Sequence, residues 1–467
     1  MLSEEETSRH LCFFIKLILP GEEMREMKEE TIRLAAAGDI LITKRIPEEN
    51  SGVAPIRKFL ERADVRLANL ETTVTDGSCF GSAFSGGTWL TTEKNCLKDI
   101  ERYGFQLLGL ANNHIMDYSY DGLAMTQKNV EEAGFCHAGC GKSLYEAARP
   151  AFLETPNGRV GVIAICSTFE EAARAGNQTQ RMPGRPGLNP LRVRNVYRIT
   201  AEHAAQLAEI SRCTGINGLR EKHRSQGFVA PLPEGVLEFG TSQFEVVDSP
   251  GQEGRFSYPD KRDVDRTLRG IREALYTCEA VVVMVHSHEI RADEESEADF
   301  FLEEFAHACI DAGACAVIGS GTHQVKGIEF YRGCPVFYCL GNFLFENEFV
   351  RNLPADYMEK YGLDENASGA EGIAVRSAQA KKSLYATREV YQTILPYLEI
   401  QNGKCSYVEL LPVSLGLDRA RHEKNLPYPA GKQEAEEICA YLNRACESYQ
   451  TKWKYVDGIL VPDQGVL

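Results

Sequence analysis

Side chains that can bind a metal ion follow strand-like apolar runs at six places in the sequence. In open α/β sheets, the loops at the carboxyl ends of the strands converge on one ligand site. Six polar endings of this kind therefore predict one shared site. In chain order they are Gly38-Asp39, Asn69-Leu70-Glu71, Asn112-Asn113-His114, His286-Ser287-His288-Glu289, His323 and Gly341-Asn342-Phe343.

The residue types in these motifs suit divalent cations that act on phosphate-like substrates. Carboxylate, imidazole and amide groups hold such ions, and the protein leaves a coordination position open for water. We expect one or two ions of Mn, Fe, Zn or Mg, and the histidines favour the transition metals. His114 is the expected catalytic residue, because it could donate a proton to a leaving group. The expected metal ligands are Asp39, Glu71, Asn113, His286 and His323.

Several of these residues also have a structural alternative. Asp39 could be a turn residue after a strand, and Asn69 with Glu71 could cap the helix that follows. Asn112 tolerates a turn conformation, and His286 could be a hydrogen-bonded core histidine. These alternatives stay open for each residue taken alone. The candidate substrate contacts at the strand ends are Asn69, Asn112 and Asn342.

The net charge of the chain restricts its partners. The 467 residues carry a formal charge of −16, which argues against nucleic acid or an anionic membrane surface as the main partner. An acidic protein that handles an anionic substrate needs metal ions to reverse the local field. A turn-rich stretch near 181–194 is locally basic, and Arg185 is our candidate substrate contact there. Solvated loop arginines are the alternative.

The cysteines indicate a reducing compartment. Their number, fifteen, is odd, and none forms a Cys-x-x-Cys motif, so we expect free thiols and a cytoplasmic protein. The apolar segment 11–19 is interrupted by Lys16 and follows an acidic stretch, which is unlike a secretory signal. We therefore expect no integral membrane segment, and translation could start at Met24 or Met27.

Alternating strand and helix patterns predict an α/β fold. We expect a core at 30–345 with an insertion at about 170–262, and a C-terminal part at 346–467 that adds strands and a helix to it. The expected helices include 53–62, 202–211, 263–277, 294–312 and 435–452. The Gly- and Ser-rich loop 77–88 could be a flap over the site or a plain surface loop.

As an ordered series, the motifs resemble the CapA-type family of poly-γ-glutamate capsule biosynthesis, which is similar to the calcineurin-like metallophosphatases. The resemblance implies a four-layer α/β/β/α sandwich with the metal site at one edge of the central sheets. It also implies that the ligands and the acid are the residues named above. The family-like stretches are Ala37-Gly38-Asp39, Ala68-Asn69-Leu70-Glu71, Leu110-Ala111-Asn112-Asn113-His114 with Asp117 and Asp121-Gly122, Gly327-Ile328-Glu329 and Phe337-Tyr338-Cys339-Leu340-Gly341-Asn342-Phe343.

The chain departs from these patterns at three places. Leu41 replaces the histidine that metallophosphatases carry two residues after the first aspartate. Gly321 replaces the first histidine of the capsule-family pattern Gly-x-His-Pro-His, and Ser287 and His288 replace a Trp-Gly pair. Our hypothesis is that His288 compensates for the ligand lost at Gly321; the alternative is that only one ion is bound tightly.

The expected function is a metal-dependent hydrolase with phosphoesterase-type chemistry, in which metal-activated water attacks the substrate. The expected substrate is an anionic small molecule or poly-γ-glutamate. The alternative is a protein with a degenerate metal site that binds poly-γ-glutamate without catalysis or acts on its γ-glutamyl amides.

Overall fold

The computed structural model describes residues 31–463. The apolar segment 11–19 and the candidate starts Met24 and Met27 lie outside the described residues. Across 31–463, no helix combines the length and the apolar composition that crossing a bilayer requires. The cysteines from Cys79 to Cys446 are free, as the sequence predicts.

The first sheet has ten strands and is centred on β1 (Ile32–Leu41). On one side β1 is followed by the parallel strands β2 (Val65–Leu70), β5 (Leu107–Gly109) and β6 (Cys136–Ala138). On the other side it pairs antiparallel with a strand from the C-terminal part, so both ends of the chain build one sheet. The remaining strands are β19 (Asn342–Phe345), β20 (Gln392–Gln401), β21 (Lys404–Ser414), β22 (Tyr428–Pro429), β23 (Trp453–Val456) and β24 (Ile459–Pro462).

The second sheet has six strands, four of them parallel. Its centre is the apolar strand β15 (Ala280–Ser287), which is buried along its whole length. A strand that is buried on both faces carries apolar side chains on both faces, which explains the uninterrupted apolar run from Ala280 to Val285. The other strands, in sheet order around β15, are β17 (Ile328–Tyr331), β18 (Cys334–Phe337), β16 (Ala316–Gly321), β9 (Gly158–Cys166) and β8 (Ala151–Thr155).

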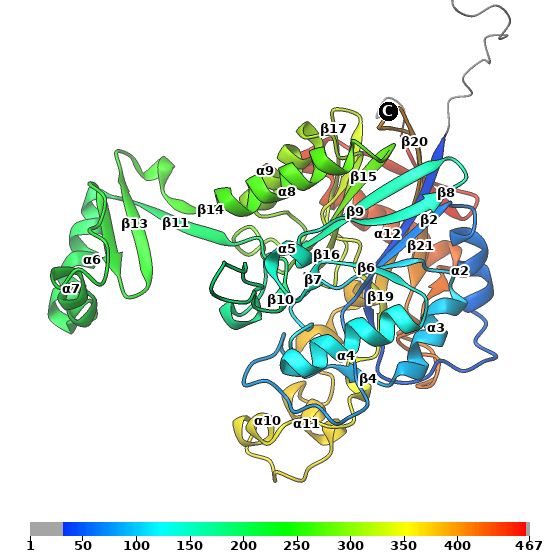
Figure 1. The fold of residues 1–467 in the computed structure, drawn as a ribbon, viewed down its shortest axis with the longest axis horizontal. Helices are drawn as coiled ribbons and strands as arrows, with labels where there is room; N and C mark the ends of the chain where they lie inside the picture. The colour runs from blue at the N-terminus through cyan, green and yellow to red at the C-terminus, as the bar shows by residue number, and fades with distance from the viewer. Residues whose placement is uncertain (1–30, 464–467) are drawn as a thin grey trace, which may run out of the picture.

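The two faces of β15 belong to two different hydrophobic cores. Val281, Val283 and Val285 pack against the helices α8 (Lys261–Ala274) and α9 (Phe300–Asp311). Met284 faces the other way, into the core shared with the first sheet, where its Cε lies close to Gly109 of β5. Each buried side chain of this size contributes about 1.5 to 3 kcal/mol. Figure 1 shows α8 and α9 beside β15. The predicted α/β class is confirmed.

The remaining helices of the body surround the first sheet and its loops. Helix α2 begins at Val53, as its apolar spacing predicts. Helix α9 begins at Phe300 and not near 294, because the side chain of Asp299 caps it there. The other helices are α3 (Leu97–Arg102), α4 (Ser119–Glu132), α5 (Leu144–Ala147), α10 (Ala355–Lys360), α11 (Gly369–Arg376) and α12 (Lys432–Ala445), and α2 itself is Val53–Leu60.

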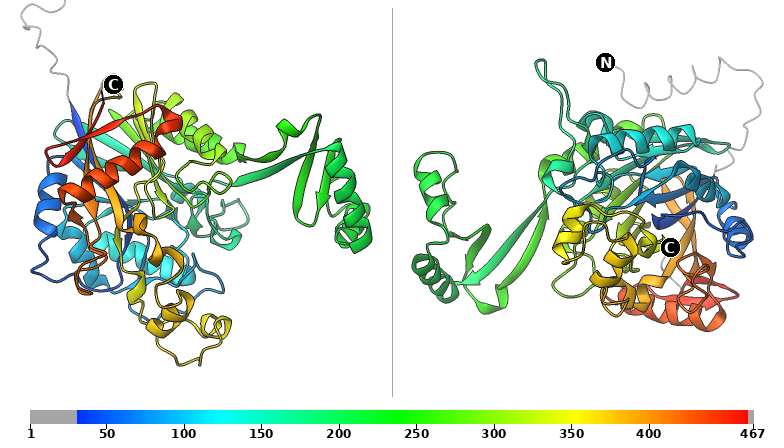
Figure 2. Two further views of the ribbon diagram at one scale, coloured as in Figure 1. Left: turned by 180° about the vertical axis from the view of Figure 1, so that it is seen from behind. Right: turned by 90° about the horizontal axis from the view of Figure 1, so that it is seen from below.

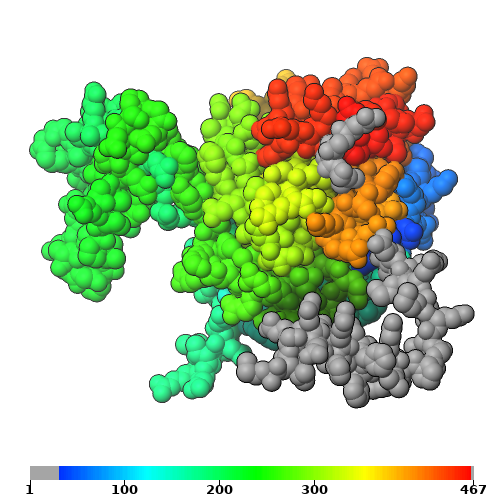
Figure 3. Space-filling model, turned by 90° about the horizontal axis from the view of Figure 1, so that it is seen from above, coloured from blue at the N-terminus to red at the C-terminus, as the bar shows by residue number. Residues whose placement is uncertain are grey.

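Much of the insertion forms an arm that projects from the body (Figures 1 and 2). It consists of a four-stranded sheet, ordered β12-β13-β11-β14, and two helices. The space-filling view shows the arm standing clear of the body (Figure 3). The sequence predicted one helix here and missed the sheet. The elements are β11 (Val193–Thr200), α6 (Ala201–Thr214), α7 (Gly218–Ser225), β12 (Val236–Phe239), β13 (Ser242–Val247) and β14 (Gly254–Pro259).

One carboxylate joins the arm to the body. The fully buried Asp299 accepts hydrogen bonds from Ser257 Oγ (2.6 Å) and Arg255 Nη2 (2.6 Å) of β14, and from the first backbone N–H of α9 (2.8 Å). We expect Asp299→Ala to lower the free energy of unfolding by about 3 kcal/mol, because the buried Ser257 hydroxyl and the Arg255 guanidinium each lose their carboxylate acceptor and keep one other hydrogen bond. The measurement is the midpoint of urea unfolding.

Asp311→Ala at the other end of α9 is the matched control. Asp311 is exposed, and among the described residues it pairs with Arg332 and Tyr331 alone, so its loss should cost less than about 1 kcal/mol. Equal shifts for the two variants would contradict the role assigned to Asp299.

Candidate metal centre

Strand register brings the predicted residues together. In the first sheet, Asp39 of β1 pairs with Asn69 of β2 on one side and with Asn342 of β19 on the other. In the second sheet, His286 of β15 pairs with Ser320 of β16. The backbone N–H of Gly321 in β16 donates to Asp39 Oδ2 at 2.9 Å, and so links the two sheet edges directly.

A local distortion of β1 aims Asp39 into this junction. The register of β1 shifts on both sides of Asp39, as it does at a β-bulge, which redirects a side chain. A Cβ atom on Gly38 would lie 1.8 Å from the carbonyl oxygen of Gly341, the same oxygen that accepts the backbone N–H of Asp39 at 3.0 Å. Only glycine allows this approach.

Asp39 is held as a carboxylate. Asn69 Nδ2 donates to its Oδ1 at 2.7 Å, and His286 Nδ1 and His323 Nδ1 lie 3.6 and 3.9 Å from its oxygens. Burial alone would raise the pKa of Asp39, but the hydrogen bond and charge of His286, with further support from His323 and Asn69, lower it to about 2. The site therefore keeps a fixed negative charge at neutral pH.

Glu71, which follows β2, is fully buried, and neither of its carboxylate oxygens has a hydrogen-bond partner. Its Oε1 lies 3.5 Å from His286 Nε2, 3.8 Å from His288 Nε2 and 3.9 Å from His114 Nε2. Burial raises the pKa of Glu71, and the charge of Asp39 raises it further. An unpaired buried carboxylate is costly, so this arrangement suits a cation that both oxygens can reach.

Two imidazole nitrogens face each other beside Glu71. His286 Nε2 and His288 Nε2 lie 3.1 Å apart, and His286 Nε2 is also 2.9 Å from Asn113 Oδ1. Burial and the neighbouring charge of His286 lower the pKa of His288 to about 3, so its ring is neutral and offers a lone pair. Burial lowers the pKa of His286, but the charge of Glu71 and the bond to Asp39 raise it overall.

Two sets of side chains in the described part of the chain could each hold a divalent ion. In each set the candidate ligand atoms lie within 4.8 Å of one another. Glu71 belongs to both sets, and neither of its carboxylate oxygens has a hydrogen-bond partner. Carboxylate and imidazole ligands in this mixture suit Zn, Mn or Fe. The residues present therefore fit a divalent metal, and the sets are Glu71, His286 and His288, and Asp39, Glu71 and His323.

His114 is oriented by Asp117. Its Nδ1 lies 2.6 Å from Asp117 Oδ2, which leaves Nε2 directed towards Glu71. The backbone N–H groups of Leu90 and Gly86 donate to the same carboxylate at 2.8 and 3.1 Å. Burial lowers the pKa of His114, but the charge and hydrogen bond of Asp117 raise it above its ordinary value. His114 is thus arranged to carry a proton on Nε2.

The loop 77–88 lies against this part of the site. Gly86 O accepts a hydrogen bond from Asn113 Nδ2 at 3.1 Å, and a Cβ atom on Gly86 would clash with the His114 ring at 2.7 Å. Arg376 at the end of α11 donates to Gly87 O at 2.9 Å and to the Thr88 hydroxyl. A segment of the C-terminal part therefore fastens the loop beside His114.

The predicted substrate contacts have other partners in this structure. Asn112 Nδ2 donates to Leu70 O at 2.7 Å, and Asn69 bonds to Asp39. Asn342 Oδ1 lies 2.8 Å from His323 Nδ1 and so orients that ring. Arg185 is exposed, and its Nε donates to the carbonyl oxygen of Arg174 at 2.9 Å. Contact of these four residues with a substrate stays a prediction.

Sequence reasoning assigned no role to several residues that the geometry makes important. The role of Asp117 could have been predicted from the sequence, because a residue three positions after His114 can reach its side chain within one turn of the chain. Ser320, whose Oγ is 3.0 Å from His286 Nδ1, has none, because only the pairing of β15 with β16 brings it there. Glu289 accepts from Ser167, Thr168 and Ser287 and belongs to neither ligand set.

Comparison with known proteins places the chain among capsule synthesis proteins. "Uncharacterized protein y4sH" of Sinorhizobium fredii is 27% identical over 90% of each chain. "Capsule biosynthesis protein CapA" of Bacillus anthracis is 21% identical over 74% of this chain and 67% of its own length. A "Probable polyglutamine synthesis accessory protein" of Mycobacterium tuberculosis is 23% identical over 62% of this chain and 57% of its own length.

The family match covers most of the chain, insertion included. It runs from residue 33 to residue 347 and so spans every strand end that contributes to the candidate metal centre. The chain belongs to the family described as "Bacterial capsule synthesis protein PGA_cap".

Proposed function

We propose that the protein is a metal-dependent hydrolase of capsule biosynthesis with phosphoesterase-type chemistry. The observation that carries the proposal is the carboxylate of Glu71, fully buried, without a hydrogen bond and common to two potential ligand sets. The residues that would hold one or two divalent ions are Asp39, Glu71, Asn113, His286, His288 and His323.

The fold supports this proposal. Two sheets share one core, and α8 and α9 cover the second sheet, an arrangement that agrees with a four-layer α/β/β/α sandwich with the site at one edge of the central sheets. Gly321 has no room for a side chain, because a Cβ atom there would lie 2.5 Å from Ser287 O. His288 belongs to a ligand set, which supports its proposed compensation for the family histidine that Gly321 replaces.

The chain's own residues would divide the work of hydrolysis. Divalent ions, when bound, lower the pKa of coordinated water and offset negative charge on the substrate. His114 would give its Nε2 proton to the leaving group, and Asp117 would keep that proton in place by holding Nδ1. The loop at Gly86, which packs against His114, would limit access of bulk water.

The substrate proposal comes from the relatives. Two of them are named for capsule biosynthesis and for polyglutamine synthesis. We propose an anionic substrate, either a phosphoester or poly-γ-glutamate with its γ-glutamyl amides. The second candidate function is a non-catalytic accessory protein that binds such a polymer, favoured by the word "accessory" in one relative's name and by Gly321. Turnover of phosphodiesters or γ-glutamyl peptides that Asp39→Asn abolishes distinguishes the enzyme from the binding protein.

Glu71→Gln should change stability in opposite directions with and without metal. In metal-free protein it removes a buried, unpaired carboxylate beside Asp39, so the free energy of unfolding should rise by about 1 to 3 kcal/mol. The same change removes the shared ligand, so stabilisation by added Mn²⁺ should vanish. The measurement is chemical unfolding with chelator and with Mn²⁺.

Glu346→Gln is the matched control, because Glu346 is also a buried glutamate with one oxygen that lacks a hydrogen bond, although Lys44 Nζ lies 3.8 Å from it, and Glu346 lies outside both ligand sets. It should leave the Mn²⁺ effect intact. If Glu71→Gln kept the full stabilisation by Mn²⁺, the metal role of Glu71 would be refuted.

His114→Gln should reduce kcat for a phosphodiester with a poor leaving group by about 10²- to 10⁴-fold, because general acid catalysis is lost. The loss should be much smaller for a nitrophenyl ester, whose leaving group needs no proton. Asp117→Asn should show the same dependence on the leaving group. A uniform loss across both substrates, at unchanged metal content, would argue that His114 only supports the fold.

A further inference from the structure

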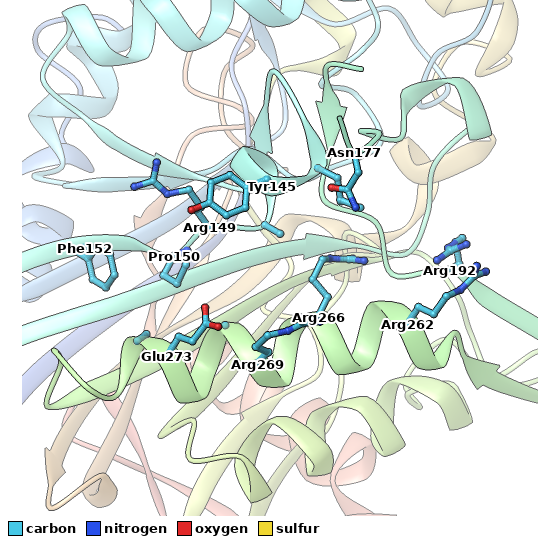
Figure 4. Close-up of a pocket in the computed structure, with 14 residues that line it drawn as sticks. Tyr145, Arg149, Pro150, Phe152, Asn177, Arg192, Arg262, Arg266, Arg269 and Glu273 are labelled. Carbon is cyan, nitrogen blue, oxygen red and sulfur yellow. The ribbon is translucent and has the colours of Figure 1, made fainter. Parts of the chain in front are cut away.

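A cavity of about 690 Å³ lies beside α8. Its walls come from α8, from α5 with the start of β8, and from Asn177 and Arg192 of the insertion (Figure 4). None of the lining residues belongs to the two ligand sets. The volume lies within the range of pockets for small ligands, about 300 to 1,000 Å³.

Two arginines form a fixed part of this wall. Arg192 Nε donates to Asp263 Oδ2 at 2.7 Å, and Arg266 Nη1 donates to Asp263 Oδ1 at 2.5 Å. Arg266 also reaches Asn189 Oδ1 at 3.0 Å. Their guanidinium groups are therefore already paired with protein acceptors, and their contribution to the cavity is mainly structural.

Three further arginines keep free donors at the same cavity. Within residues 31–463, Arg149 and Arg269 make no side-chain hydrogen bond or ion pair, and Arg262 has only a 3.4 Å contact with Asp260 Oδ2. The cavity is lined by five arginines, and the acidic residues beside them are Asp260, Asp263 and Glu273. The net charge of these eight residues is therefore +2. Such an excess is unexpected in a protein with a net charge of −16, because its overall field repels anions.

Apolar side chains complete the cavity. Tyr145 and Phe152 are 71% and 39% exposed, and Pro150 and Ala148 lie between them in sequence. Figure 4 shows Tyr145, Pro150 and Phe152 on the side opposite α8. A ligand with an uncharged part could cover these rings while its charged groups meet the arginines.

We propose that this cavity binds a small anion with at least two phosphate or carboxylate groups. Guanidinium forks bind either group in a bidentate way. Arg262 and Arg269 are seven residues apart on α8, which corresponds to about 10 Å along the helix, so they suit two charged groups at opposite ends of one ligand. Arg149 contacts the ligand from the facing wall, and Tyr145 covers its uncharged part.

The test is isothermal titration with two probes that carry the competing chemistries, fructose 1,6-bisphosphate and adipate. One of them, or both, should bind the wild-type protein, and the double variant Arg149→Gln/Arg269→Gln should bind it at least about tenfold more weakly. Both positions are exposed, so the variant should fold with an unchanged melting temperature.

Arg272→Gln is the matched control, because Arg272 is exposed on the same helix but does not line the cavity. It should bind like the wild type. Preference for the bisphosphate identifies a phosphate ligand, and preference for adipate identifies a carboxylate ligand. Absence of binding for both probes at about 10 mM, or an equal loss in the control and the double variant, would overturn the proposal.

Discussion

The repulsion between two buried carboxylates, those of Asp39 and Glu71, is the main physical constraint on this structure. Asp39 and Glu71 stand at the ends of neighbouring strands, both fully buried, and the carboxylate of Glu71 has no hydrogen bond at all. Bringing two such groups out of water opposes folding, and the four histidines near them offset only part of the cost. A divalent cation would offset the rest, which is the physical basis for the proposed metal centre.

The scaffold around this pair explains how the cost is tolerated. Long apolar strands surround it on both sheets, and β1 alone has eight fully buried residues in succession from Leu34 to Leu41. The close approach at Gly38 and the N–H of Gly321 fix the Asp39 carboxylate through backbone atoms, which cannot change rotamer. The Asp39 carboxylate is therefore held in place before any ion binds.

The proposed acid, His114, and the loop 77–88 beside it are held together by shared hydrogen bonds. Asp117 binds His114 and two backbone N–H groups, so one carboxylate connects the loop 77–88 to the imidazole of the proposed acid. Arg376 adds a link from beyond residue 347, where the family match ends. The C-terminal part thus takes part in the site as well as in the first sheet, where β20 pairs with β1.

Much of this could be predicted from the sequence, for physical reasons that also explain the failures. Apolar runs such as 281–285 predict buried strands, and polar residues at their ends predict a shared site. The arm sheet was missed because β11 and β13 bury few residues and lack a clear alternation. The helix predicted at 294–312 begins only at Phe300, because Asp299 caps it, and residue spacing alone does not reveal this cap. Partners such as Ser320 depend on pairing between distant strands.

The most direct test of the central claim is anomalous diffraction from crystals grown with Mn²⁺. The account predicts one or two anomalous peaks within about 2 to 2.5 Å of the Glu71 carboxylate, each also bound by His286, His288 or His323. Crystals that bind Mn²⁺ elsewhere and leave Glu71 without an ion would contradict it.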